Sequence, residues 1–106
     1  MVNKVLLHNE ICQILNDMYA KKNADYGDSF SKARQEIPNY TLGKIYDKFS
    51  RYRNIMNSNP LVGEETIKDT LMDLANYCIM ELIEMQLEEA ECEYMPASML
   101  DYNKED

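Results

Sequence analysis

Glycine and proline are scarce in this sequence, with three of each among 106 residues. These two residues supply many of the tight turns that a sheet-rich fold needs, so their scarcity argues against an all-β fold. No apolar run approaches the ~18 residues that a membrane helix requires. Residues 1–10 lack the apolar segment and cleavage site of a signal peptide. We therefore expect a cytoplasmic protein with no membrane contact.

Cysteine and histidine are too few for most metal or triad chemistry. The three cysteines, Cys12, Cys78 and Cys92, form no C-x-x-C pair, which predicts reduced and mostly packed thiols. His8 is the only histidine. A single histidine near a chain end does not indicate a zinc site or a His-based triad.

Acidic residues outnumber basic ones, but unevenly along the chain. The formal net charge is −8, yet residues 1–63 hold nine Lys or Arg and six Asp or Glu, whereas residues 64–106 hold two and thirteen. The overall negative charge argues against stable DNA or RNA binding. The asymmetry predicts a basic element facing an acidic one, so that they either pair or hold a ligand carrying phosphate and metal between them.

Helical periodicity accounts for most of the chain. The apolar spacing predicts helices over residues 3–24, 28–36, 41–57 and 64–91. In the third segment Ile45, Phe49, Tyr52 and Met56 form an apolar stripe, with Lys48, Arg51 and Ile55 on its flank. We assign residues 1–92 to one domain and residues 93–106 to an acidic tail.

These segments predict an all-α fold, a small bundle of three main helices and one short helix. The last helix is apolar over more than half its girth, which is typical of a helix buried on several sides. A chain this short buries only a modest core. We therefore expect oligomerisation, to a homodimer or larger, to complete the bundle.

A stripe of carboxylates begins the last helix. Glu65, Asp69 and Asp73 are spaced by four residues, and Asn76 lies on the same strip. Further along, this strip carries Met80, Ile83 and Leu87, which predicts that it points inward along its whole length. Carboxylates placed there need a cation, because an unpaired buried charge is costly.

Three interpretations of the stripe stay open. It can be an ion-pair network with Lys48 and Arg51 of the third helix, a metal or phosphate site, or an exposed acidic stripe. Magnesium fits the second interpretation, since it prefers oxygen ligands and takes one or two carboxylates plus phosphate oxygens. The other acids of the helix, Glu81, Glu84, Glu88 and Glu91, fall mostly on the opposite side and are interpreted as solvated surface.

Residues 25–30 are interpreted as a loop that joins an acid, aromatic rings and a hydroxyl, the kind of segment that often carries function. A helix cap with a hydrophobic anchor explains the same residues equally well.

Three sequence blocks together resemble the nucleotide modification associated domain type 1, a small all-helical family common in phages and prophages. The blocks are K-N-A-D-Y-G-D-S-F at residues 22–30, I-Y-D-K-F-S-R at 45–51 and E-T-I-K-D-T-L-M-D-L-A-N-Y at 65–77. The resemblance covers about residues 10–87. That family is in turn similar to the MazG and dimeric dUTPase type of all-α nucleoside triphosphate pyrophosphatases, which hold Mg²⁺ with acidic residues on helices.

The resemblance implies a Mg²⁺-dependent pyrophosphohydrolase acting on a free nucleotide in the bacterial host cytoplasm. Its metal ligands would be Glu65, Asp69, Asp73 and Asp47. Lys48 and Arg51 would hold phosphate and stabilise developing negative charge, and Glu65 would orient the attacking water. Asp25, Tyr26 and Asn76 would complete the nucleotide-binding set.

Two other functions remain open. The first helix lacks the E-x-x-E pair of the pyrophosphatases, because it carries only Glu10 and Asp17 before residue 25. That absence favours a non-catalytic nucleotide binder that sequesters or escorts its ligand. An acidic protein-interaction module is the third alternative, in which the stripe pairs with Lys48 and Arg51 and nothing else binds.

Overall fold

The computed structural model describes residues 1–26, 28–57 and 64–93, apart from the side chains of residues 25, 26, 64, 65, 92 and 93. Four helices and no strand occupy these described residues: α1 (Lys4–Tyr26), α2 (Ser29–Glu36), α3 (Tyr40–Met56) and α4 (Glu64–Glu93). The all-α class, with three long helices and one short one, is confirmed. None of the described helices combines the length and apolar character that a membrane crossing requires. Most of the acidic tail, residues 94–106, lies outside the described residues.

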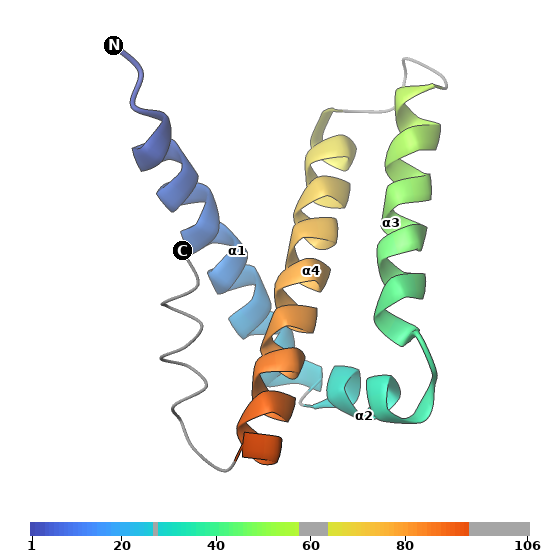
Figure 1. Ribbon diagram of the computed structural model, residues 1–106. Coiled ribbons are helices and arrows are strands. Elements are labelled where there is room, and N and C mark those ends of the chain that lie inside the picture. The colour runs from blue at the N-terminus through green and yellow to red at the C-terminus, as the bar shows by residue number, and fades with distance from the viewer. Residues whose placement is uncertain (27, 58–63, 94–106) are drawn as a thin grey trace.

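The long helices α3 and α4 run antiparallel, side by side, while α2 crosses near the lower end of the molecule (Figure 1). α1 approaches α4 with its C-terminal half, where the Asn76 amide donates to the Leu15 carbonyl oxygen at 3.2 Å. The N-terminal half of α1 diverges from α4 (Figure 1). Three helices therefore meet α2 at one end of the molecule.

The loop expected over residues 25–30 is wrong. α1 continues through Tyr26, and Ser29 already begins α2. No glycine or proline interrupts α1 before Gly27, and the lysines and alanines that precede it favour a helix. Asp28 does take the N-cap position of α2, but its side chain makes no capping hydrogen bond. α2 ends at Glu36, before Pro38, as the sequence predicts.

α3 faces α4 with a surface rotated from the expected stripe. Thr41 is buried, and Ile45, Lys48, Tyr52 and Ile55 are half-buried along the same face, whereas the stripe residues Phe49 and Met56 are exposed. Lys48 and Ile55 of the expected flank thus belong to the interface, whereas Arg51 is exposed. Lys48 pairs there with a carboxylate of α4 at 3.1 Å.

The single chain buries very little apolar surface. Among the described residues Leu15 is the one buried hydrophobic side chain, whereas eighteen large hydrophobic side chains are exposed. Five of these lie on the first four turns of α1 and six on α4: Val5, Leu6, Leu7, Ile11 and Ile14, then Leu71, Ile79, Leu82, Ile83, Met85 and Leu87. The prediction that one strip of α4 points inward along its whole length is therefore wrong at Leu87, which is 54% exposed. Cys12 and Cys78 are free thiols, but exposed rather than packed.

Candidate functional site: a cavity between the four helices

A cavity of about 350 Å³ lies between α1, α2, α3 and α4. This volume is within the range of natural small-molecule sites, roughly 300–1,000 Å³. Every helix contributes to its wall. The lining residues are Tyr19, Lys22, Asn23, Asp28, Ser29, Phe30, Ser31, Tyr40, Lys48, Asp73, Asn76, Tyr77, Met80, Ile83 and Glu84.

α4 supplies the longest wall of the cavity. Asp73, Asn76, Tyr77, Met80 and Glu84 recur at three- and four-residue spacing, so they share one face of the helix. Asp73 and Glu84 are eleven residues apart, which corresponds to about 16 Å along the axis at 1.5 Å per residue. The cavity therefore has two carboxylates on α4, well separated along the helix.

Two lysines converge on the first of these carboxylates. Lys48 of α3 donates to one oxygen of Asp73 at 3.1 Å, and Lys22 of α1 donates to the other at 3.5 Å. Asp73 and Lys48 are half-buried, whereas the Lys22 side chain is 61% exposed. The expected pairing of a basic element with the acidic last helix is confirmed at this point. Of the stripe, Asp73 alone is seen to pair with Lys48 among the described side chains.

This group, Lys22, Lys48 and Asp73, is called the lysine end of the cavity below. It carries one net positive charge, because two ammonium groups share one carboxylate. Each ammonium has three donors, and one bond to Asp73 leaves the others available. Such a group can bind a phosphate oxygen while the carboxylate keeps both lysines in place.

Three aromatic rings also line the cavity, and Tyr77 lies one turn after Asp73 on α4. The Phe30 centroid lies 5.7 Å from that of Tyr40 and 6.2 Å from that of Tyr77, in tilted arrangements. Lys44 is 5.4 Å from the Tyr40 centroid and extends this cluster on the side of α3. Rings in such a cluster offer π-faces on which a planar base can stack. Phe30, Tyr40 and Tyr77 are called the aromatic end below.

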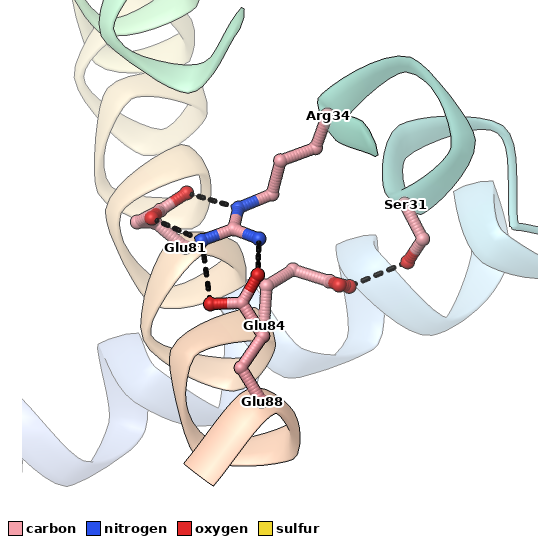
Figure 2. A network of polar contacts seen from close by, with 5 residues as sticks. All are labelled: Ser31, Arg34, Glu81, Glu84 and Glu88. Atoms are coloured by element: carbon pink, nitrogen blue, oxygen red, sulfur yellow. Dashed lines mark hydrogen bonds and ion pairs between the residues drawn. The ribbon is translucent and has the colours of Figure 1, made fainter. Parts of the chain in front are cut away.

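α2 is held against the cavity by an ion-pair network with α4. Arg34 binds both oxygens of Glu81, at 2.9 and 2.8 Å, and also pairs with Glu88 (Figure 2). One turn earlier on α2, Ser31 donates to Glu84 (Figure 2). The interpretation of these acids as solvated surface is therefore wrong for Glu81 and Glu84, which are half-buried, and confirmed for Glu88 and Glu91, which are exposed. α2 packs against this side of α4, which the helical wheel of α4 alone does not reveal.

The network shifts the pKa of both partners in the direction expected for a strong pair. The hydrogen bonds from Arg34 lower the pKa of the Glu81 carboxyl, although burial opposes the shift. The hydrogen bonds to Glu81 and Glu88 raise the pKa of the Arg34 guanidinium. A bidentate arginine–carboxylate pair is also geometrically specific, so it fixes the orientation of α2.

The structure brings together some of the site residues inferred from the sequence and leaves others apart. Lys48, Asp73 and Asn76 line the cavity. Asp47, Arg51 and Asp69 are exposed and lie outside the cavity lining. The prediction that this strip of α4 points inward is therefore also wrong at Asp69. The side chains of Asp25, Tyr26 and Glu65 lie outside the description, so their roles stay predictions.

The donor set around Asp73 does not by itself fit a metal ion. Among the described residues, no three Asp, Glu, His or Cys side chains lie close enough together to hold one. Both oxygens of Asp73 already accept hydrogen bonds from ammonium groups. A divalent cation at Asp73 would have to displace or face these two positive charges. The lysine end therefore favours an anion over a metal.

Sequence reasoning pointed to the aromatic segment that holds Phe30 but missed Lys22, Tyr40 and Tyr77. Lys22 opens the first of the three sequence blocks, yet it lies 51 residues from Asp73, and only the approach of α1 to α4 joins them. Tyr40 and Tyr77 belong to different helices and meet through Phe30. The one available signal was the spacing of Asp73, Asn76, Tyr77, Met80 and Glu84, which marks a mixed polar and aromatic face on α4.

The fold and cavity define a small all-α domain with a polar-aromatic pocket. The family profile described as Nucleotide modification associated domain 1 matches residues 22–85. The match takes in the last residues of α1, all of α2 and α3 and most of α4, and it includes every cavity-lining residue except Tyr19. The chain belongs to this family. No curated protein and no solved structure matches the chain.

Proposed function

We propose that the chain binds a free nucleotide in the cavity between its four helices. The phosphate lies at the lysine end and the base at the aromatic end. The observation that carries this proposal is the convergence of Lys22 and Lys48 on Asp73 in the same cavity that Phe30, Tyr40 and Tyr77 line. Membership of the nucleotide modification family supports it.

The net charge of the site favours a ligand with few phosphates when no metal is present. The lysine end holds one net positive charge, and Asp28 and Glu84 add two carboxylates elsewhere in the lining. A triphosphate brings more negative charge than the two lysines can offset, and the three carboxylates of the lining add to the repulsion. We therefore expect a monophosphate to bind at least as tightly as a triphosphate in EDTA.

The pyrophosphohydrolase function is a second candidate. Asp73, one of the acids that the resemblance assigns to Mg²⁺, lies in the cavity wall beside the proposed phosphate position. With Mg²⁺ added, such an enzyme would bind a triphosphate more tightly and release pyrophosphate. Asp69 and Asp47 are exposed in the single chain, so the binding function has the stronger geometric support.

Thermal unfolding with a nucleotide panel tests the proposal. A ligand at 100 times its dissociation constant stabilises the fold by about 2.7 kcal/mol. For a domain of this size the melting temperature would rise by about 10 °C. A shift in EDTA supports the binder, and a shift that needs both Mg²⁺ and a triphosphate supports the pyrophosphohydrolase. No shift with any nucleotide contradicts both and leaves the lysine end as a structural ion-pair group.

A further inference from the structure

Glu84 is the carboxylate of the cavity that the proposed phosphate site does not use. It lines the same wall as Asp73, eleven residues further along α4, beside Tyr77 and Met80 of the aromatic side. Its side chain is half-buried and points toward α2, where Ser31 donates to its Oε2 (Figure 2). None of the ion pairs between described residues involves Glu84.

Within the described part of the chain, the Glu84 carboxylate is an acceptor without a matching cation. Each of its oxygens has two lone pairs, and the Ser31 hydroxyl uses one of the four. The neighbouring acids Glu81 and Glu88 both pair with Arg34, whose single positive charge offsets one of their two negative charges. Glu84 therefore keeps acceptor capacity that faces the cavity next to the rings.

We propose that Glu84 reads the edge of the bound base and selects a base with two adjacent N–H donors, such as guanine. This inference rests on the proposed nucleotide function. The N1–H and 2-amino groups of guanine present two parallel donors, which a carboxylate accepts as a bidentate pair. The acceptor positions on adenine and on uracil would instead face a negative oxygen.

The dimensions of the site agree with this assignment. Asp73 and Glu84 are separated by about 16 Å along α4. The Nζ atoms of Lys22 and Lys48 lie at the Asp73 carboxylate. Tyr77 lies between Asp73 and Glu84 along α4, and the Phe30 ring is 6.2 Å from the Tyr77 ring. A nucleotide with its phosphate at the lysines therefore places its base, and not its sugar, near Glu84.

Calorimetric titration with guanosine, inosine, adenosine, cytidine and uridine monophosphates in EDTA tests this role. Inosine monophosphate differs from the guanine nucleotide only by the missing 2-amino group. Because a hydrogen bond to a charged group contributes strongly, guanine should bind about tenfold or more tighter than inosine. Glu84→Gln should remove that preference.

Two controls separate base recognition from support of α2. Ser31→Ala removes the hydroxyl donor and leaves the carboxylate, so it should keep the guanine preference. Glu89→Gln makes the same charge change at an exposed residue outside the cavity and should also keep it. A loss of preference in Ser31→Ala equal to that in Glu84→Gln would overturn the base-reading role.

The outcomes also distinguish this inference from the proposed function. Similar affinities for guanine and inosine nucleotides, or a guanine preference that persists in Glu84→Gln, overturn the inference and leave nucleotide binding intact. A wild-type protein that binds none of the five monophosphates in EDTA overturns both.

Discussion

At the scale of single residues, the fold uses Asp73 to hold two ammonium groups beside one cavity. Lys22 and Lys48 reach it from different helices, at 3.5 and 3.1 Å. In water two lysines this close would repel each other, and the carboxylate offsets that repulsion. Asp73 therefore positions the cations, whichever ligand they bind.

Replacing Asp73 by Asn separates the phosphate-binding and metal-binding interpretations. Without the carboxylate the lysine end carries two positive charges, so nucleotide affinity in EDTA should be kept or should increase. If Asp73 ligates a metal that the nucleotide needs, the affinity measured with Mg²⁺ should vanish instead. Because Lys22 is 61% exposed, the lost pairs should lower the free energy of unfolding by only about 1 kcal/mol. Titration calorimetry and urea unfolding measure the two effects.

Protonation of Glu81 should make the fold acid-sensitive. The pKa of its carboxyl is lowered in the folded state, mainly by the hydrogen bonds from Arg34. A carboxyl with a lowered pKa contributes stability above its unfolded pKa of about 4.3 and loses it as the pH falls through the folded value. Stability measured from pH 6 to pH 3 should therefore decline more steeply in the wild type than in Glu81→Gln. Equal slopes would contradict this role of the pair.

At the scale of the elements, the sequence predicts well where the helices lie and predicts poorly how they pack against one another. Helical periodicity located all four helices to within a few residues, because each has its own apolar spacing and natural breakers. It did not predict that α2 packs on the acidic side of α4. That contact depends on Arg34 reaching Glu81 and Glu88 across 47 and 54 residues. The same limit applies to the candidate site. The sequence pointed to Asp73 and Lys48, but it did not show that Lys22 of another helix meets them.

Removing the arginine should release α2. In Arg34→Met both carboxylates lose their partner, and the half-buried pair with Glu81 should cost about 2 kcal/mol of stability. Hydrogen exchange should speed up over residues 29–36 and much less over α3. Lys32→Met alters an exposed cation on the same helix and serves as the control. Unchanged exchange in α2 would show that other contacts hold it.

At the scale of the whole molecule, the single chain has an incomplete core. Leu15 is its one buried hydrophobic side chain among the described residues, and the apolar turns of α1 diverge from the rest of the molecule (Figure 1). A domain needs more buried apolar surface than this to offset its conformational entropy. We propose that a second copy of the chain covers the exposed faces of α1 and α4.

Light scattering after gel filtration checks the proposed self-association. The wild-type mass should be at least twice the 12.4 kDa of one chain. Ile11→Glu and Leu82→Glu each place a charge on an apolar side chain that is 51% or 55% exposed, so they should shift the mass toward the monomer. Asn16→Glu adds the same charge at an exposed polar position of α1 and should leave the mass unchanged. A well-folded wild-type monomer would contradict the proposal.

The most direct test of the central claim is nucleotide binding to a variant in which the whole lysine end is neutral. No unpaired charge remains at that end in the triple variant Lys22→Met, Lys48→Met, Asp73→Asn. The fold should therefore persist. The account expects affinity for nucleoside monophosphates in EDTA to fall about a hundredfold or more, because two charge-assisted phosphate contacts are lost. Lys21→Met, which removes an adjacent exposed charge outside the cavity, should change little. Wild-type affinity in the triple variant would show that the nucleotide binds elsewhere or that the lysines have no part in binding.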